Sequence, residues 1–368
     1  MKYLFDSTNI KSMKLKNRLF KSGSWEGLAT EDSHMTDDLF KVYEELAKGG
    51  VGTIATGYAH VEKNEQPAPN MMGIYDDSFI PEYKELTDMV HSYGANIIMQ
   101  ITYGGTRSHL DKPSSVIYGA SPVKNQVTGI VPKEIGKDEI RNLVKSFGKA
   151  AARVKKSGFD AVQIHAAHGY FLSQFLCPYY NRRNDEYGGS IENRARIIIE
   201  IYHEIRAQVG DDYPILIKFN SEDFMEDGLT SEDSIAVSKM LEEAGIDAIE
   251  VSGGNDSALY VVENNLDAIR KKVAFSTDKQ SYFKNHAEKL AKVISIPVIL
   301  TGGNRDINVM NDILNNTNIE YFGLCRTLIR EPGLINEWKD GDNKTPKCIS
   351  CNQCLNTYGK RCIFNLNK

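Results

Sequence analysis

One pattern of apolar and polar residues recurs along the chain. An amphipathic stretch ends at a glycine, a short apolar run follows, and small or polar residues come next, as in ELAKGGVGTIATGY, VKKSGFDAVQIHAAHG and LEEAGIDAIEVSGG. The glycine fits the C-terminal cap of a helix, and the apolar run fits a strand that is covered on both faces. The pattern therefore predicts helices that alternate with parallel strands, as in consecutive βαβ units.

The number of repeats predicts a closed barrel. The apolar runs give eight strands, near residues 19–22, 52–56, 96–101, 161–165, 215–220, 248–252, 297–301 and 321–324, and a helical pattern follows each one. Eight strands and eight helices are the count of an α/β protein with a (β/α)8 TIM barrel. A doubly wound open sheet is the alternative, but no G-x-G-x-x-G motif follows the first strand. We predict a barrel domain over residues 1–340 and a short cysteine-rich C-terminal extension over residues 341–368.

Composition and charge exclude several classes of protein. The chain has 368 residues, of which 41% are hydrophobic and 25% charged, and its formal net charge of −5 includes no long run of one sign. This balance indicates neither nucleic acid nor an anionic membrane surface as a partner. The sequence also lacks a secretory signal core and any apolar stretch of about eighteen residues, the length of a spanning helix. Since four of the six cysteines crowd into the tail instead of spreading as cross-links, we expect a cytoplasmic protein.

The active site of a TIM barrel lies at the C-terminal ends of its strands. The residues at the predicted strand ends are rich in hydrogen-bond donors and poor in carboxylates, which suits an anionic or carbonyl-bearing ligand better than a divalent metal. They are Ser22, Gly23 and Ser24, residues 56–58 with Tyr58, Gln100, His165, His168 and Tyr170, Lys218, residues 252–254, residues 301–304 and residues 323–326.

A phosphate site is predicted after the seventh and eighth strands, where TIM barrels commonly bind phosphate. The motif LTGGN contributes Gly302 and Gly303, and the motif GLCR contributes Gly323 and Arg326. Glycine lets backbone N–H groups approach phosphate oxygens, and an arginine adds a bidentate charge. The alternative is that these glycines only turn the chain.

Two histidines follow the fourth strand in the motif HAAHGY. His165 and His168 are three residues apart, whereas helical metal-binding pairs are usually four apart with a glutamate between them. The spacing therefore argues against a metal. Imidazoles can donate hydrogen bonds to a developing oxyanion, and the phenol of Tyr170 can deliver a proton. A buried structural role for one histidine is the alternative.

The same segment resembles a known family. HAAHGYFLSQFLCPYYNRRNDEYGGSIENRARIIIEI closely resembles the signature of the Old Yellow Enzyme family of FMN-dependent oxidoreductases, and the likeness extends from LKNRLFKSGS to YFGLCRTLIREPGLINEW. The resemblance implies FMN in the barrel mouth, NADH or NADPH as the reductant, and hydride transfer to the activated C=C bond of an α,β-unsaturated carbonyl compound.

The resemblance also implies a role for each residue that matches the family motifs. Ser22, Gly23, Ser24 and Gln100 would lie against the isoalloxazine ring, and Lys218 would face its N1/O2 edge, where a cation stabilises the reduced flavin. Gly303 and Arg326 would bind the phosphate. His165 and His168 would hold the substrate oxygen, while Tyr170 would protonate the α-carbon.

Three aromatic positions depart from the common family pattern. Trp25 stands where many members carry a cysteine or threonine, Tyr103 where a histidine is frequent, and Tyr58 where a small residue is frequent. Bulky rings at the mouth could narrow the pocket or stack on a planar substrate. They leave the identity of the substrate open but not the class of chemistry. Since the first cysteine is Cys177, we do not expect covalently attached flavin.

The tail carries a cysteine motif. Cys348, Cys351, Cys354 and Cys362 form a C-x2-C-x2-C-x7-C pattern. Four closely spaced thiolates suit a [4Fe-4S] cluster or zinc, and free thiols are the alternative. The start of the motif is similar to that of the family branch with trimethylamine dehydrogenase and 2,4-dienoyl-CoA reductase, which binds a cluster there. Here the last interval is shorter, and the nucleotide-binding domains which that branch appends are not present in this sequence.

The sequence thus favours an FMN-dependent ene-reductase that acts on a small molecule and, by analogy with related barrels, forms a homo-oligomer. An alternative enzyme is an amine dehydrogenase that cleaves C–N bonds and passes electrons through a tail cluster to an electron-transfer partner. Another alternative is a non-catalytic flavin redox sensor whose tail docks a partner. The last alternative is a barrel without FMN in which Lys218 forms a Schiff base with the substrate.

Overall fold

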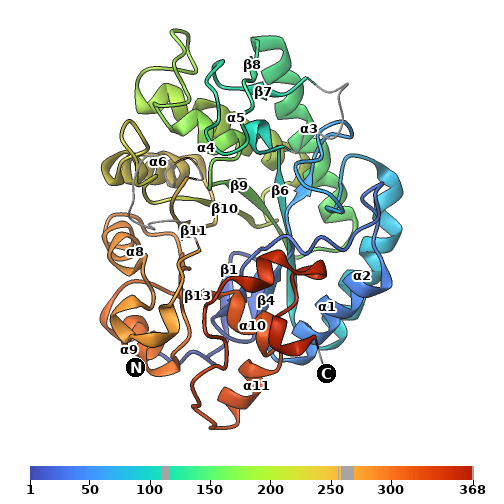
Figure 1. Ribbon diagram of the computed structural model, residues 1–368, viewed down its shortest axis with the longest axis vertical. Helices are drawn as coiled ribbons and strands as arrows, with labels where there is room; N and C mark the ends of the chain where they lie inside the picture. The colour runs from blue at the N-terminus through green and yellow to red at the C-terminus, as the bar shows by residue number, and fades with distance from the viewer. Residues whose placement is uncertain (109–115, 256, 258–268, 367–368) are drawn as a thin grey trace.

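A closed parallel barrel forms the body of the protein. The computed structural model describes residues 1–108, 116–255, 257 and 269–366. Eight strands pair in parallel, in the order β3–β4–β6–β9–β10–β11–β12–β13 and back to β3, and helices surround them (Figure 1). The strands are β3 (Leu19–Lys21), β4 (Thr53–Ala55), β6 (Asn96–Thr102), β9 (Ala161–Ala166), β10 (Ile215–Asn220), β11 (Ala248–Ser252), β12 (Val298–Leu300) and β13 (Tyr321–Leu324). The predicted TIM barrel is confirmed.

Helices follow the strands as the sequence pattern predicts. They are α1 (Asp37–Lys48) after β3, α2 (Ile80–Ser92) after β4, α3 (Lys137–Lys156) after β6, α4 (Phe171–Leu176) and α5 (Ile191–Val209) after β9, α6 (Ser231–Ala244) after β10, α8 (Lys284–Ala291) after β11, α9 (Ile307–Asn316) after β12, and α10 (Arg326–Arg330) with α11 (Leu334–Lys339) after β13. Thr36, Ser190 and Thr230 accept backbone N–H bonds at the starts of α1, α5 and α6. Gly245 ends α6 at a φ of 105°, in the left-handed region that glycine adopts without strain.

An N-terminal hairpin closes one end of the barrel. The antiparallel strands β1 (Thr8–Ile10) and β2 (Met13–Leu15) bring Ile10, Met13 and Leu15 into one buried apolar cluster with residues of the barrel strands. Those residues are Phe20, Ala55, Ile98, Ala161, Leu216, Ala248, Ile299 and Tyr321. Since this end is apolar and sealed, polar groups inside the barrel lie toward the C-terminal ends of the strands.

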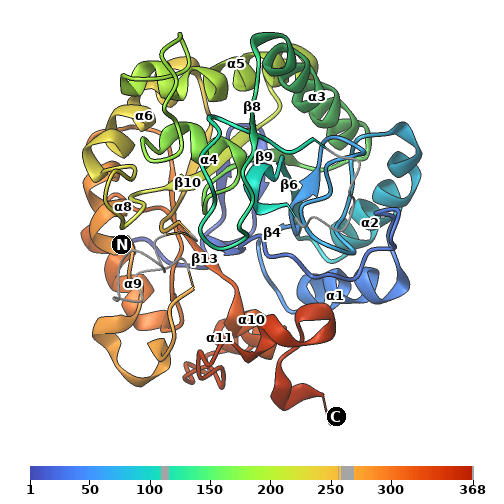
Figure 2. The same cartoon turned by 45° about the horizontal axis from the view of Figure 1, so that its top comes forward.

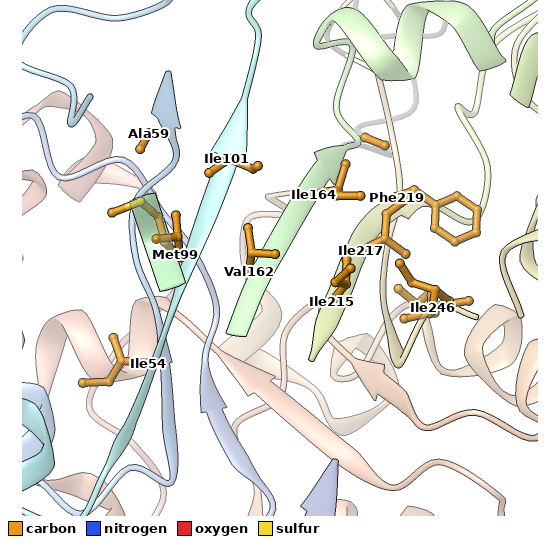
Figure 3. Packing of buried hydrophobic residues seen from close by; sticks show 14 of the residues in the cluster. Ile54, Ala59, Met99, Ile101, Val162, Ile164, Ile215, Ile217, Phe219 and Ile246 are labelled. Carbon is orange, nitrogen blue, oxygen red and sulfur yellow. The ribbon is translucent and has the colours of Figure 1, made fainter. Parts of the chain in front are cut away.

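Side chains alternate between the two faces of each strand. Val162, Ile164, Ile217 and Phe219 belong to the large cluster that packs between the strands and the surrounding helices, and Figure 3 shows them on β9 and β10. Gln163 lies between two of them in sequence and therefore faces the interior. These apolar outward positions explain why the strands read as nearly continuous apolar runs.

The remaining elements are short and lie mostly in the loops. They are the strands β5 (Ala59–His60), β7 (Tyr118–Gly119) and β8 (Lys133–Glu134), and the 3-10 helices η1 (Asp77–Phe79), η2 (Gly105–Arg107), η3 (Val273–Phe275), η4 (Thr277–Lys279), η5 (Gln353–Asn356), η6 (Tyr358–Lys360) and η7 (Ile363–Asn365). Of the described helices, none is long and apolar enough to cross a membrane.

The C-terminal tail lies outside the ring of barrel helices. Between α11 and residue 366 the described chain forms only the short helices η5, η6 and η7, and Figure 2 shows this red segment beside α10 and then descending to the C-terminus. Buried Arg305, in the loop after β12, donates to Pro346 O at 2.9 Å and to Ser350 Oγ at 3.3 Å. The tail is thereby attached to the barrel, and the domain boundary at residue 340 stays a prediction.

Candidate active site

A cavity of about 450 Å³ is lined by residues at the C-terminal ends of the barrel strands. This volume falls within the range of about 300–1,000 Å³ that is usual for small-molecule and cofactor sites. The structure brings together at this cavity all the residues that the sequence predicted for catalysis and cofactor binding. They are Ser22, Gly23, Ser24, Tyr58, Gln100, His165, His168, Tyr170, Lys218, Gly302, Gly303, Gly323 and Arg326.

The two histidines are held in fixed orientations. His165 is on β9, and its Nδ1 accepts a hydrogen bond from Ala167 N at 3.3 Å, so that its proton is on Nε2. His168 has a φ of 61°, Asn220 Oδ1 accepts a bond from its backbone N–H at 3.1 Å, and its Nε2 lies 2.7 Å from Ser252 Oγ. Burial lowers the pKa of both rings well below the ordinary value, and the nearby charge of Lys218 adds to the effect. Both imidazoles are therefore neutral donors at neutral pH.

Two tyrosine hydroxyls meet beside His165. Tyr170 donates a hydrogen bond of 2.6 Å to the hydroxyl of Tyr58, and its ring centroid lies 4.8 Å from that of His165. Arg107, which the sequence analysis did not select, lies over the Tyr170 ring at 4.9 Å and donates to the His168 carbonyl at 2.8 Å. A phenol, a cation and two neutral imidazoles therefore face one side of the cavity. Such a group can bind a carbonyl oxygen and deliver a proton.

A buried polar network underlies the cavity and was also missed by the sequence analysis. Glu250 on β11 accepts from Gln163 Nε2 at 2.7 Å and from Ser22 Oγ at 2.6 Å, and it pairs with Lys218 Nζ at 3.1 Å. Gln163 in turn accepts from Gln100 at 2.7 Å. The network joins side chains of four strands and fixes the position of Lys218. A signal for it was present, because Gln163 and Glu250 interrupt otherwise apolar strand runs.

The opposite end of the cavity contains glycines and arginines. Gly302 and Gly303 have φ values of 93° and 84°, which an L side chain rarely adopts. Arg326 donates through Nη1 to Arg270 O at 2.7 Å and to Asn352 Oδ1. Arg305 also lines this end, although the sequence analysis did not select it. Flexible backbone and two guanidinium groups are suited to a phosphate.

A comparison with known families agrees with this arrangement. Residues 3–345 match the NADH:flavin oxidoreductase / NADH oxidase family. The chain belongs to this family. The resemblance to flavin-dependent oxidoreductases of the Old Yellow Enzyme type, predicted from the sequence, is thereby confirmed, whereas its assignment to the iron–sulfur branch stays a prediction.

Several members of the NADH:flavin oxidoreductase family are similar over almost the whole chain. A protein named NADH oxidase from Thermoanaerobacter brockii is 34% identical over 99% of this chain and 54% of its own length. One named cinnamate reductase from Clostridium sporogenes is 30% identical over 96% of this chain and 55% of its own. The structure of a 2-naphthoyl-CoA reductase complex superposes with a TM-score of 0.86 at 26% identity, over 95% of this chain and 54% of that one. The chain thus spans about half the length of these relatives.

The residues at the cavity fit the FMN that this family uses. Three residues that line it each carry a buried polar atom without a hydrogen-bond partner within the described part of the chain; these atoms are Trp25 Nε1, Arg305 Nε and Thr327 Oγ1. Buried donors without partners are unfavourable, so a polar ligand would satisfy them. Lys218 and Arg326, for which the resemblance implies contacts with the ring edge and the phosphate, both line this cavity. A flavin cofactor and a nicotinamide reductant are consistent with all of these features.

The four tail cysteines lie around one small cavity, and the metal site that their spacing predicts stays a prediction. Cys348, Cys351, Cys354 and Cys362 all line a second, small cavity of about 20 Å³, which holds about one water molecule. In the ranges that the structure describes, no group of three or more histidine, cysteine or acidic side chains is arranged to hold a metal ion. The [4Fe-4S] or zinc assignment is therefore not supported.

Tyr103 also differs from its expected position. It packs edge-on against Phe171 at 4.9 Å between ring centroids, and it is not among the described residues that line the main cavity. Trp25 does line the cavity, and the ammonium group of Lys360 from the tail lies 4.3 Å from its ring centroid. The tail therefore forms part of the cavity wall, to which it contributes Cys348, Cys354 and Lys360.

Proposed function

We propose that the protein is an FMN-dependent ene-reductase that transfers hydride from NADH or NADPH to the activated C=C bond of an α,β-unsaturated carbonyl compound. The observation that carries the proposal is the grouping of His165, His168 and Tyr170 on one side of the cavity, with both imidazoles neutral and the phenol hydrogen-bonded. Neutral donors suit a carbonyl oxygen on which negative charge develops.

The chain's own residues would divide the work of the reaction. FMN, when bound, supplies the two-electron chemistry that links the nicotinamide to the alkene. The Nε2–H of His165 and the ring of His168 would hold the substrate oxygen and polarise the double bond. Tyr170 would then give its hydroxyl proton to the α-carbon. Lys218, held by Glu250 at 3.1 Å, would place a positive charge at the flavin edge, and Arg326 would bind the phosphate.

The names of two similar proteins support this class of substrate. The relative from Clostridium sporogenes is named for the reduction of cinnamate, and the solved structure is of a reductase with 2-naphthoyl-CoA. Both names describe an unsaturated acyl compound with a planar ring. Trp25 and Tyr58 at the cavity of this protein offer faces on which such a ring can stack.

The test is an anaerobic half-reaction experiment on protein loaded with FMN. NADH or NADPH is expected to bleach the flavin absorbance, and cyclohex-2-enone or cinnamate is expected to restore it. Mass spectrometry of the product should show two added hydrogens. Bleaching by dimethylglycine and not by either nicotinamide would instead favour the amine dehydrogenase. Protein that stays colourless after addition of FMN would contradict the proposal.

A further inference from the structure

The hydroxyl of Tyr170 is hydrogen-bonded to the hydroxyl of Tyr58. Tyr58 follows β4 and Tyr170 follows β9, and the barrel brings their oxygens to 2.6 Å although they are 112 residues apart. Their ring centroids are 5.1 Å apart, and that of Tyr58 is 5.8 Å from His165. Both rings line the main cavity. The two tyrosines therefore lie on the side of the cavity that holds His165, and they face the cavity itself.

The two tyrosines differ in their access to solvent. Tyr170 is only 6% exposed, whereas Tyr58 is partly exposed. In the resting state Tyr170 donates its proton to Tyr58, so the proton of Tyr58 is directed elsewhere. Burial against its neighbours raises the pKa of Tyr58 well above its ordinary value, so Tyr58 keeps its proton at neutral pH. Tyr58 can therefore pass a proton from water to the less exposed Tyr170.

We propose that Tyr58 is a positioning residue for the proton donor Tyr170 and returns a proton to it in each catalytic cycle; this rests on the proposed function. Tyr170 gives its proton to the substrate α-carbon while hydride, supplied by NAD(P)H, reaches the β-carbon. The hydrogen bond between the phenols then reverses, and the Tyr58 proton passes to the Tyr170 oxygen. Tyr58 takes a proton from water at its exposed side. The net reaction adds one hydride and one solvent proton to the double bond.

The surroundings favour this reversal. Loss of its proton leaves Tyr170 as a phenolate, which is stabilised by a hydrogen bond from Tyr58 and by the Arg107 guanidinium 4.9 Å from the ring. His165 and His168 add no positive charge of their own, since both are neutral. Without Tyr58, the phenolate would lose its hydrogen-bond donor, and proton transfer to the substrate would become slower.

The test compares Tyr58→Phe, Tyr170→Phe and the double variant in the anaerobic half-reactions of the FMN-loaded protein. Tyr58→Phe is expected to leave flavin reduction by NAD(P)H unchanged and to slow flavin reoxidation by cyclohex-2-enone about 10- to 100-fold. The double variant should be no slower than Tyr170→Phe alone, because the two hydroxyls act in one path. Tyr103→Phe, which removes a buried hydroxyl away from the cavity, is the matched control and should behave as wild type.

Two further measurements distinguish a role of Tyr58 in proton transfer from a role in packing alone. The alkaline limb of the reoxidation rate should move to higher pH in Tyr58→Phe, because Tyr58 no longer stabilises the Tyr170 phenolate. The solvent deuterium isotope effect should increase, as protonation becomes rate-limiting. A Tyr58→Phe variant with wild-type reoxidation, or with a slower rate but an unchanged pH profile and isotope effect, would overturn the proposal. If Tyr170→Phe reduced the alkene as fast as wild type, Tyr170 would not be the proton donor and the proposal would also be overturned. A wild-type protein that did not reduce the alkene at all would contradict the proposed function instead.

Discussion

At the scale of single residues, the proposed chemistry depends on histidines that stay neutral. Burial lowers the pKa of His165 and His168 well below the ordinary value, so neither ring should titrate above that value. We expect kcat/KM for cyclohex-2-enone to show no histidine ionisation between about pH 6 and pH 8. Replacement of His165 by alanine should raise KM about 10-fold or more, because the substrate oxygen loses a donor. A wild-type step centred near pH 6.5 would contradict this interpretation.

Glu65 is a second buried group with an unusual pKa. Its Oε1 accepts from Gly104 N, Gly105 N and Ser108 Oγ, yet burial raises the pKa of the carboxyl to about 8. The folded protein therefore binds a proton more tightly than the unfolded chain does. The stability from this group is present below the unfolded pKa and is lost as pH rises through about 8, by about 1.4 kcal/mol per pKa unit.

This linkage predicts the effect of Glu65→Gln. The amide oxygen can accept the same bonds without a charge, so the variant should lose less stability than wild type between pH 5 and pH 8.5. The measurement is the urea midpoint at each pH. Glu31→Gln on the exposed surface is the control and should follow the wild-type pH dependence. A parallel decline for Glu65→Gln would show that Glu65 is ionised in the fold throughout.

At the scale of the elements, an ion pair joins two neighbouring strands beneath the cavity. Lys218 on β10 and Glu250 on β11 are both almost fully buried, so removal of the lysine leaves a buried carboxylate with less compensation. We expect Lys218→Met to destabilise the FMN-free protein by about 3 kcal/mol in urea unfolding. Addition of Glu250→Gln should restore part of this loss. Lys239→Met, on the exposed face of α6, should change stability by less than about 0.5 kcal/mol.

The tail motif needs a direct assay of metal content. Cys348, Cys351, Cys354 and Cys362 surround a single cavity of about 20 Å³. Iron and sulfide should be measured on protein purified without oxygen, together with its absorption spectrum. About four irons per chain and a broad brown absorbance would confirm the [4Fe-4S] prediction made from the spacing. Six titratable thiols without iron, zinc or sulfide would show it to be wrong.

At the scale of the whole molecule, Arg305 connects the barrel to the tail. Its guanidinium is buried and bonds to Pro346 O and Ser350 Oγ. Arg305→Met should remove both bonds and speed proteolytic cleavage of residues 341–366 about 10-fold, while the circular dichroism of the barrel stays unchanged. Gln353→Met on the exposed surface of the tail is the control. Equal cleavage rates in both variants would mean that other contacts hold the tail.

Much of the fold and the site was predictable because it depends on local features of the sequence. Apolar runs at regular intervals predicted all eight barrel strands, each to within one residue at either end. The rule that barrel chemistry lies at strand ends then selected residues that line one cavity. The rule did not predict Gln163 and Glu250 because they lie in the middle of strands. The rule did not predict Arg107 and Arg305 because they lie in loop segments, where the position of a residue along the chain does not determine the direction of its side chain.

The sequence by itself determined which residues could meet, since the alternation of apolar runs and glycines follows from the period of each element. The tertiary structure decided which residues do meet and which protonation state each of them has. Closure of the barrel brought Tyr58 to Tyr170, joined Glu250 to Lys218, Ser22 and Gln163, and removed water from His165 and His168. Periodicity is a local property of the chain, whereas desolvation and contacts between distant strands arise only when the sheet closes.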